Sequence, residues 1–325
     1  MTSGRRHRSR PVDVPALIER AQAGEALAVA RLISLVEQDH PALPELAALL
    51  TPHTGRARVV GVTGSPGVGK STSTSVLVSA YRAQGTRVGV LAVDPSSPFS
   101  GGALLGDRVR MQDHATDDGV FIRSMATRGH LGGLSWATPQ ALRVLDAAGC
   151  QLILVETVGV GQAEVEIASL ADTTLLLLAP GMGDGIQAAK AGVIEIADIF
   201  VVNKADRDGA DQTVRDLRYM LSLGGRHSAA GAWRPEIVRT VATSGEGADE
   251  VIAAIDKHTA WSAKSGELDR RRRARAAAEI EAIAVATMRA GFRDVHSSAS
   301  LSALAGDVVA GTTDPYSAAE RLLSD

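Results

Sequence analysis

The sequence predicts an α/β fold in which helices flank a mainly parallel central sheet. From Val59 onward, short apolar runs bounded by turn residues alternate with segments of helical apolar spacing, which is the pattern of βαβ units. Aromatic residues make up only 3% of the chain, and this aliphatic composition suits a parallel sheet better than a β-sandwich. A chain of 325 residues can hold one such domain of about 200 residues together with helical additions.

The chain begins with a segment of helical periodicity. Residues 14–50 carry apolar side chains at helical spacing until Pro41 and Pro44 interrupt the pattern, so we expect a helical N-terminal extension over residues 1–55. We interpret its basic start as a solvated tail, with a phosphate-rich partner as the alternative. The basic residues are Arg5, Arg6, Arg8 and Arg10.

Composition limits the expected partners and compartment. A formal charge of −3 indicates no polyanionic partner, so we expect no bound nucleic acid. No run reaches the eighteen or so apolar residues of a membrane span, and no apolar signal-peptide core follows the basic start, so we expect a cytoplasmic protein without membrane contact. The single cysteine, Cys150, excludes an intramolecular disulfide and fits a reducing compartment, and we expect it to be buried before a strand.

The α/β domain is predicted to occupy residues 56–262. Each candidate strand is a short apolar run next to turn residues. The candidate strands are residues 58–63, 87–93, 119–123, 151–155, 173–179, 199–203 and 237–241.

Strands end before Trp261, and residues 263–325 are predicted to form a helical C-terminal arm for dimerisation. A charged stretch with four consecutive arginines, residues 270–273, leads into a helix expected to end near Gly291. We interpret these arginines as a solvated helix face or as interfacial ion pairs, with nucleic-acid contact as the alternative. Short helices should follow, the last with Asp314 as N-cap and Pro315 at its first position. Such an arm cannot bury its apolar stripe alone, so it folds back on the core or pairs with a second copy.

A glycine-rich motif lies between the strand that ends at Thr63 and the helical segment that begins at Ser71. Its residues match G-x-x-x-x-G-K-S/T and are Gly64, Ser65, Pro66, Gly67, Val68, Gly69, Lys70 and Ser71. The glycines permit a loop whose backbone N–H groups point at phosphate oxygens, and the helix adds its positive N-terminal end. We expect Lys70 to reach the β and γ phosphates of a nucleotide and Ser71 to bind Mg²⁺. A Gly-rich turn without a ligand is the alternative, which the strand-loop-helix context disfavours.

A second motif, Asn203-Lys204-Ala205-Asp206, follows an apolar strand and so lies at the carboxyl edge of the sheet, where ligands bind in open α/β folds. A strand-end Asp carboxylate can accept the N1–H and the exocyclic amine of guanine, and adenine lacks this pair of donors. Together the two motifs predict GTP instead of ATP. A later stretch resembles the fifth GTPase motif, in which a backbone N–H, here that of Ala242, meets the guanine oxygen.

The strand at residues 151–155 leads into Glu156-Thr157-Val158-Gly159, in the place where P-loop GTPases usually have Asp-x-x-Gly. Glu156 therefore stands in place of the aspartate. We expect its carboxylate to hold Mg²⁺ through water and the Gly159 N–H to sense the γ-phosphate. A strand-end acid that caps a helix is the alternative. Because Val160 stands where Ras-like enzymes carry the glutamine that orients the attacking water, intrinsic hydrolysis should be slow.

Asp94 ends the strand at residues 88–93 and opens a polar loop rich in Gly, Pro and Ser. We prefer a magnesium-binding or catalytic carboxylate over a turn-forming Asp-Pro, because loops of this kind beside a nucleotide are ordered by the ligand. Asp107 follows within reach of the same region. His114 and His130 lack partners at metal-ligand spacing, so we expect both to be surface or loop histidines.

Several longer blocks of sequence occur together in this chain. They are VTGSPGVGKST at residues 62–72, VDPSSP at 93–98, TRGHLGG at 127–133, ETVGVGQ at 156–162 and PGMGDGIQ at 180–187. With these blocks the chain resembles the MeaB/ArgK-type GTPases, bacterial relatives of the human methylmalonic aciduria type A protein. The resemblance covers nearly the whole chain, and it departs at Met125-Ala126, where a Pro-containing segment is expected before the third block.

The resemblance implies a homodimeric G-protein chaperone for adenosylcobalamin-dependent methylmalonyl-CoA mutase. Such a protein gates delivery of the cofactor to the mutase, and it protects or reactivates that enzyme through GTP binding and hydrolysis. The implied switch loops are residues 94–111, 156–166 and 181–190, the last of which would sense the mutase. The catalytic residues implied are Lys70, Asp94, Asp107 and Glu156, and the magnesium ligands are Ser71, Asp94 and Glu156. Thr72, at the end of the first block, joins the nucleotide-binding residues.

Other functions share part of this pattern. A metal-insertion GTPase for a nickel enzyme has the same nucleotide motifs but usually carries a His-rich tract or a cysteine metal motif, and the sequence has neither. A protein kinase, the older description attached to the ArgK name, would transfer phosphoryl to a protein. A binding module with a structural nucleotide would hold GTP without turnover.

Overall fold

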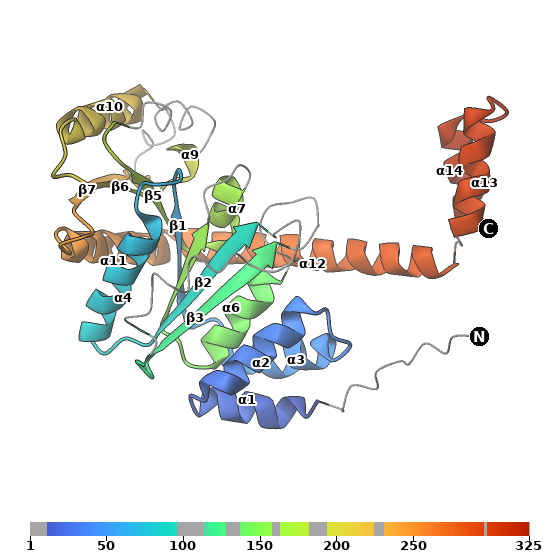
Figure 1. The fold of residues 1–325 in the computed structure, drawn as a ribbon, viewed down its shortest axis with the longest axis horizontal. Coiled ribbons are helices and arrows are strands. Elements are labelled where there is room, and N and C mark those ends of the chain that lie inside the picture. The colour runs from blue at the N-terminus through green and yellow to red at the C-terminus, as the bar shows by residue number, and fades with distance from the viewer. Residues whose placement is uncertain are drawn as a thin grey trace. The chain divides into compact units, whose positions relative to one another are not determined.

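Among the residues that the structure describes, seven parallel strands form one sheet (Figure 1), in the order β3-β2-β4-β1-β5-β6-β7. The structure is a computed structural model and describes residues 12–95, 114, 116–127, 137–157, 163–181, 194–223, 231–295 and 298–324. The strands are β1 (Arg58–Thr63), β2 (Val88–Pro95), β3 (Val120–Thr127), β4 (Leu152–Thr157), β5 (Thr173–Leu178), β6 (Ile199–Asn203) and β7 (Glu236–Thr240). The predicted α/β fold is confirmed, and β2 and β3 extend further toward their carboxyl ends than the apolar runs indicate.

Successive side chains of each strand pack on opposite faces of the sheet, because a strand repeats every two residues. In β1, Val59 belongs to the hydrophobic cluster on one face, whereas Val60 and Val62 belong to the cluster on the other. The first face is covered by α6 (Thr138–Ala147), α7 (Ala163–Leu170), α9 (Ile194–Ile196) and α10 (Ala210–Leu223), and the second by α4 (Lys70–Ala83) and α11 (Ala248–Ser265). The sheet is therefore buried on both faces, as its apolar strands require.

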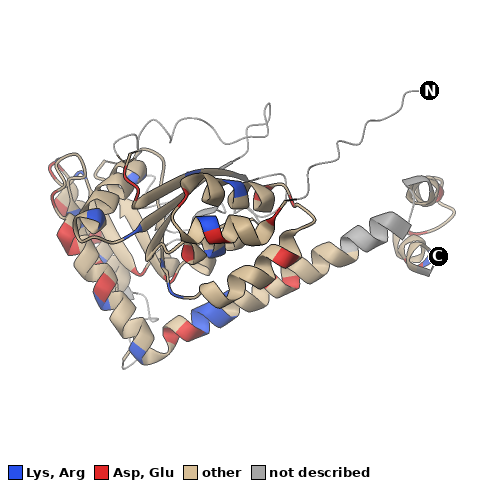
Figure 2. Cartoon of the chain, turned by 90° about the horizontal axis from the view of Figure 1, so that it is seen from below, with Lys and Arg blue, Asp and Glu red and all other residues tan. Residues whose placement is uncertain are grey.

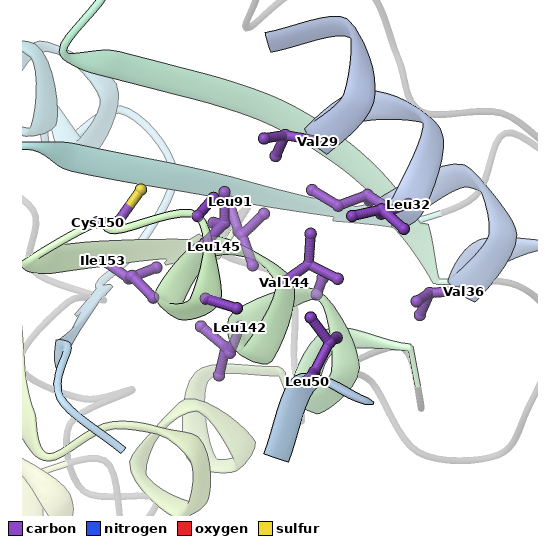
Figure 3. Packing of buried hydrophobic residues seen from close by; sticks show 14 of the residues in the cluster. Val29, Leu32, Val36, Leu50, Leu91, Leu142, Val144, Leu145, Cys150 and Ile153 are labelled. Atoms are coloured by element: carbon purple, nitrogen blue, oxygen red, sulfur yellow. The ribbon is translucent and has the colours of Figure 1, made fainter. Parts of the chain in front are cut away.

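The N-terminal extension is helical, as predicted, and packs into the core of the first face. Its helices are α1 (Val14–Gln22), α2 (Ala26–Glu37) and α3 (Leu43–Leu50), which lie together beside α6 (Figure 1). Figure 3 shows Leu32 and Val36 of α2 on the side of the helix that faces Val144 of α6. The Asp146 carboxylate also accepts backbone N–H groups of the segment that leads into β1, including that of Ala57 at 3.0 Å. The extension is thus held by apolar packing and by a fixed carboxylate.

The structure tests the predictions for two residues outside the nucleotide motifs. Cys150 is buried two residues before β4, as predicted, and burial raises the pKa of its thiol to about 12. His114 lies in the connection between β2 and β3, but a surface position is wrong because its side chain is buried against α4, where its Nε2 lies 3.1 Å from Ser75 Oγ. Spacing in the sequence does not reveal this contact, since the two residues are far apart along the chain. His130 lies outside the described residues.

The described chain divides into two compact units, residues 1–271 and 272–325. The helices that end the chain are α12 (Glu267–Val295), α13 (Ser298–Val309) and α14 (Pro315–Ser324). Asp314 is the N-cap of α14, as predicted, because its carboxylate accepts the backbone N–H groups of Tyr316 at 2.9 Å and Ser317 at 3.1 Å. Within the described residues, no helix has the length and apolarity needed to cross a lipid bilayer.

The start of α12 is fixed to the amino edge of the sheet by an ion pair between the half-buried Arg271 and the buried Asp198. The Arg271 guanidinium donates to both oxygens of Asp198 at 2.7 and 2.8 Å, and its Nε donates to Glu267 at 2.8 Å. His258 Nε2 lies 3.3 Å from Asp198, and His258 Nδ1 lies 2.8 Å from Thr173 Oγ1. We call these five residues the amino-edge network.

The amino-edge network changes the interpretation of the arginine run. Burial by itself raises the pKa of Asp198, but Arg271 and His258 outweigh that effect and hold the pKa at about 2. Figure 2 shows acidic and basic residues together near the start of α12 instead of an unbroken basic face. For Arg271 the expected solvated or interfacial role is wrong, because its partner is a buried carboxylate of the same chain.

Candidate functional site

The glycine-rich loop lies at the carboxyl end of β1, where the connections of the sheet change direction. Strands β1 and β5 are neighbours, yet the chain leaves β1 toward β2 on one side and leaves β5 toward β6 on the other. In open α/β folds the crevice at such a point binds ligands. The helix α4 begins at Lys70, at the end of the loop, so its first backbone N–H groups lie at the same edge.

Two glycines of the loop are required by close packing. Gly64 has a φ of 141°, and a Cβ there would lie 2.3 Å from the carbonyl oxygen of Leu177. Gly69 has a φ of 98°, and a Cβ there would lie 2.4 Å from the side-chain nitrogen of Asn203. Only glycine fits both the positive φ and the missing space. The loop is therefore pressed against β5 and against the second nucleotide motif.

Lys70 is buried and points back into the loop. Its Nζ donates to the carbonyl oxygens of Gly64 at 2.7 Å and Ser65 at 3.2 Å. An ammonium held in this way lies among the backbone groups that would surround a phosphate. Carbonyl oxygens are weaker partners for an ammonium than phosphate oxygens, so an anionic ligand can replace them.

The structure brings Ser71 and Glu156 together. Ser71 Oγ donates to Glu156 Oε1 at 2.6 Å, and both residues are buried. Glu156 is paired in register with Val62 of β1 and with Ala92 of β2, so its strand lies directly beside the loop. A hydroxyl and a carboxylate are the oxygen ligands that Mg²⁺ prefers, and this donor pair fits that ion.

The other expected carboxylates are only partly described. Asp94 lies near the end of β2, where its backbone is in register with Ala126 of β3, two residues beyond the partner of Glu156. This register places the Asp94 backbone at the same edge of the sheet as Glu156. Asp107 and Gly159 lie outside the described residues.

Asn203 joins the nucleotide motifs to one another. Its Nδ2 donates to the carbonyl oxygen of Val68 at 2.8 Å, and its Oδ1 accepts from Ala242 N at 3.0 Å and from Thr240 Oγ1 at 3.2 Å. The next residue, Lys204, donates from Nζ to the carbonyl oxygen of Gly67 at 2.7 Å. One buried amide therefore spans the glycine-rich loop, the strand-end motif and the loop after β7.

The expected guanine ligands differ in how free they are. Asp206 is exposed near the end of β6, where a base can reach it. The Ala242 N–H already donates to Asn203, so it can meet a guanine oxygen only by sharing or exchanging that bond. Pro66 and Thr72 are exposed and Ser65 is half-buried, so they line the outer side of the same loop.

Sequence reasoning missed Thr240 and Leu177. Thr240 supports Asn203 through its hydroxyl, and Leu177 presents the carbonyl oxygen that excludes a side chain at position 64. Thr240 could have been found from the sequence, because it lies two residues before Ala242 of the fifth motif. Leu177 could not, because it acts through its backbone carbonyl and not through its side chain.

Comparison with known proteins gives consistent results. The family described as methylmalonyl Co-A mutase-associated GTPase MeaB matches residues 29–295 of this chain. A protein of Pyrococcus horikoshii named as a GTPase is 50% identical over 316 residues, which cover 96% of this chain and 98% of its own length. The mitochondrial methylmalonic aciduria type A homolog of Mus musculus is 38% identical over 267 residues, which cover 77% of this chain and 64% of its own length.

Among solved structures, one described as an LAO/AO transport system kinase has a similar fold. Its TM-score with this chain is 0.70 at 28% sequence identity, and the match covers 97% of this chain and 99% of that chain.

Proposed function

The chain belongs to the MeaB family of GTPases, and on this premise we propose that it is a G-protein chaperone of methylmalonyl-CoA mutase. In this role it gates adenosylcobalamin delivery to the mutase, and it protects or reactivates that enzyme. The observation that carries the nucleotide part is the bonding of Asn203 to both Val68 and Ala242, which links three GTPase motifs in one site. The mutase part rests on the association that the family's description names.

The phosphates would occupy the cradle that Lys70 now fills. Lys70 would exchange its bonds to Gly64 and Ser65 for the β and γ phosphates, because charge-assisted hydrogen bonds to phosphate are stronger than those to carbonyl oxygens. The backbone N–H groups at the start of α4 would face the same anion. Binding would then begin with a local exchange of the partners of Lys70.

Mg²⁺ would be held by Ser71 and Glu156, with Asp94 as the third proposed ligand. The hydrogen bond between Ser71 and Glu156 keeps both oxygens on the phosphate side of the sheet before the ion arrives. When bound, the ion supplies positive charge that neutralises the phosphates. Because Ser71 and Glu156 are both buried, their side chains would hold the ion in a defined position.

Guanine would be selected by Asp206 and by the loop that Asn203 holds. The exposed Asp206 carboxylate can accept the N1–H and the exocyclic amine of guanine. Lys204, bonded to Gly67, closes the base site against the phosphate loop. ATP would leave the Asp206 carboxylate facing ring positions without two donors, which disfavours it.

We propose slow intrinsic hydrolysis that the mutase accelerates. Val160 stands in the position of the glutamine that orients water in Ras-like enzymes, so the chain's own residues position the attacking water poorly. Asp94 and Asp107 are the proposed carboxylates of the first switch, and Gly159 is the proposed sensor of the γ-phosphate. A partner that positions these residues against the nucleotide would raise the rate.

We also propose that residues 272–325 pair with a second copy of the chain. This unit presents exposed apolar side chains, which are favourable to bury against a partner. They are Ile280, Ile283, Met288, Leu301, Val309, Tyr316 and Leu323. A chain that ends after Arg271 keeps the amino-edge network, so it should stay folded and be monomeric by light scattering. A dimer of that shortened chain would move the interface elsewhere.

The proposed function is tested by phosphate release from GTP, measured for the protein alone and with methylmalonyl-CoA mutase, with ATP as the nucleotide control. We expect slow GTP turnover that the mutase accelerates and little turnover of ATP. GTP turnover that does not respond to the mutase would support the GTPase activity and contradict the assignment of the mutase as its client.

Three further measurements separate the other functions. A kinase, the activity named for the solved structure with a similar fold, predicts a labelled protein acceptor when γ-labelled GTP is used. A metal-insertion GTPase predicts binding of nickel or zinc, and a structural nucleotide predicts bound GTP with no turnover whatever partner is added.

A further inference from the structure

The loop that follows β7 is closed by its own backbone. Val241 N donates to the carbonyl oxygen of Glu246 at 3.0 Å, and Ser244 N donates to the carbonyl oxygen of Val241 at 3.0 Å. Ala242, whose N–H is expected to meet the guanine oxygen, lies inside this closed loop. We call residues 241–247 the base loop. Because the base loop is closed on itself, its placement on β7 sets the position of the Ala242 N–H.

The base loop ends in a glycine that packs directly on β7. Gly247 has a φ of 83° and precedes the first residue of α11. A Cβ at this position would lie 2.1 Å from the carbonyl oxygen of Arg239 and 3.0 Å from the Cα of Thr240. Such contacts are sterically forbidden, so the end of the base loop can lie on β7 only because residue 247 has no side chain.

The residue beneath Gly247 belongs to the guanine-binding arrangement. Thr240 is only 7% exposed, its Oγ1 donates to Asn203 Oδ1 at 3.2 Å, and its carbonyl oxygen accepts from Ala205 N at 3.0 Å. Asn203 Oδ1 also accepts from Ala242 N at 3.0 Å. Gly247 therefore packs against a residue that is bonded to the strand-end motif through its side chain and through its backbone.

We propose that Gly247 determines base specificity as a positioning residue: its packing on β7 holds the Ala242 N–H where the 6-oxo group of guanine is received. This inference rests on the proposed function. A side chain at position 247 would displace the base loop from Arg239 and Thr240, and Ala242 would move with it. The 6-oxo group would then lose its donor.

The inference predicts a pattern across ligands. GDP and inosine diphosphate share the 6-oxo group, and only GDP has the exocyclic amine assigned to Asp206, whereas pyrophosphate has neither group. The glycine-rich loop is bonded to the strand-end motif through Val68 and Asn203, a contact that does not involve the base loop. Displacement of the base loop should therefore weaken GDP and inosine diphosphate equally and leave pyrophosphate unchanged.

The test compares two glycines of the base loop by calorimetry on the full chain with these three ligands. Gly247→Ala should lower the affinity for GDP and for inosine diphosphate about 10-fold each, which corresponds to roughly one hydrogen bond. Gly245→Ala is the matched control, because Gly245 also has a positive φ, 79°, but a Cβ there would meet nothing within 4 Å. Its backbone strain is similar and its steric contact is absent, so all three affinities should stay within about 2-fold of the wild-type values.

A second readout follows the positioned group directly. In a chain labelled with ¹⁵N-alanine, the amide signal of Ala242 should move in Gly247→Ala and stay in place in Gly245→Ala. If Gly247→Ala does not fold, Thr240→Val tests the same contact, because it removes the hydroxyl bonded to Asn203 and keeps the side-chain shape. Thr240→Val should lower the affinity for both nucleotides about 2- to 10-fold and leave pyrophosphate unchanged.

Three outcomes overturn the inference. If the wild-type chain prefers GDP over ADP and Gly247→Ala keeps the wild-type affinity for GDP, the role of Gly247 fails and the proposed function stands. If pyrophosphate loses affinity together with the nucleotides, the change acts on the whole site and not on base recognition. If the wild-type chain binds GDP no better than ADP, the guanine selection of the proposed function fails, and the specificity role of Gly247 fails with it.

Discussion

The two edges of the sheet use buried polar side chains in different ways. At the carboxyl edge, Lys70 and Lys204 bond to loop carbonyl oxygens, and Ser71 bonds to Glu156. In the proposed site, phosphate oxygens would replace the carbonyl partners of Lys70, and a cation would replace the hydrogen bond between Ser71 and Glu156. At the amino edge, Asp198 receives two hydrogen bonds from one guanidinium, so its partner is geometrically matched and fixed.

A binding site and a structural ion pair differ in how strongly their buried charges are paired. A buried charge is tolerated in either place because it is paired. It becomes available for binding only where its partner is weaker than the ligand, as a carbonyl oxygen is for Lys70. Where the partner is a bidentate ion pair, as for Asp198, the group holds elements together instead.

The largest effect on stability should come from breaking the amino-edge network. Asp198→Ala removes the carboxylate that faces His258 and leaves the part-buried Arg271 with Glu267 alone, so we expect a loss of about 2 to 3 kcal/mol of unfolding free energy. Urea unfolding can be followed by tryptophan fluorescence, since Trp233 and Trp261 pack against His258. The control is Asp256→Ala, which removes an exposed pair with Arg58 and should cost less than about 1 kcal/mol. Equal losses in the two variants would contradict the distinction between the edges.

Removal of the cation at the carboxyl edge should affect binding and leave stability almost unchanged. Lys70→Ala removes the charge that faces the β and γ phosphates, and hydrogen bonds to charged groups contribute about 1.5 to 3 kcal/mol each, so GTP affinity should fall about 100-fold. Calorimetry measures the affinity, and Lys257→Ala, at an exposed lysine of α11, is the control. An unchanged affinity would refute the assignment of the phosphate loop.

A smaller effect is expected on the selection of guanine, and it should depend on one carboxylate, that of Asp206. In Asp206→Asn the new amide presents a donor where two donors must be accepted, so the preference for GTP over ATP should fall about 10-fold or more. Asp208→Asn tests the same change at an exposed neighbour in the same loop and should leave the preference unchanged. Competition binding with both nucleotides measures the ratio, and equal ratios in the two variants would remove Asp206 from the base site.

Lowering the pH should gradually reduce the stabilisation that the amino-edge network provides. The pKa of Asp198 is about 2 in the folded chain against an ordinary value of 3.8, so its carboxylate stabilises the fold at pH values above about 4. As the pH falls from about 4 to about 2, the carboxylate gains a proton and about 2 kcal/mol of that stabilisation is lost. Urea midpoints at pH 5, 4 and 3 measure the decline. Asp198→Asn should show a shallower decline than the wild-type chain, and an equal slope in both would assign the acid sensitivity to other groups.

Several features could be predicted from residues close together in the sequence. Each strand was predicted because its apolar run and flanking turn residues are local, and the N-cap role of Asp314 follows from the Asp-Pro pair at the start of a helix. The loop from Gly64 to Ser71 was recognisable because phosphate binding requires glycines and a lysine at fixed spacing. The carboxyl edge, where the motifs gather, follows from parallel strands alone.

Contacts between distant residues could not be predicted in this way. The buried place of His114 on α4 and the bond from Asn203 to Val68 each join segments that are far apart in the chain. The arginine run gave no sign that Arg271 differs from its neighbours, because all four residues have the same chemistry. What distinguishes Arg271 is the direction in which its side chain leaves α12.

The strands, the nucleotide motifs and the family can be read from the sequence, because local periodicity and motif spacing are properties of neighbouring residues. Which polar groups keep exchangeable partners at the carboxyl edge, and which form a fixed ion pair at the amino edge, depends on the folded chain. A buried charge is stabilised by whatever group packing places within hydrogen-bond distance, as Asp198 is by Arg271.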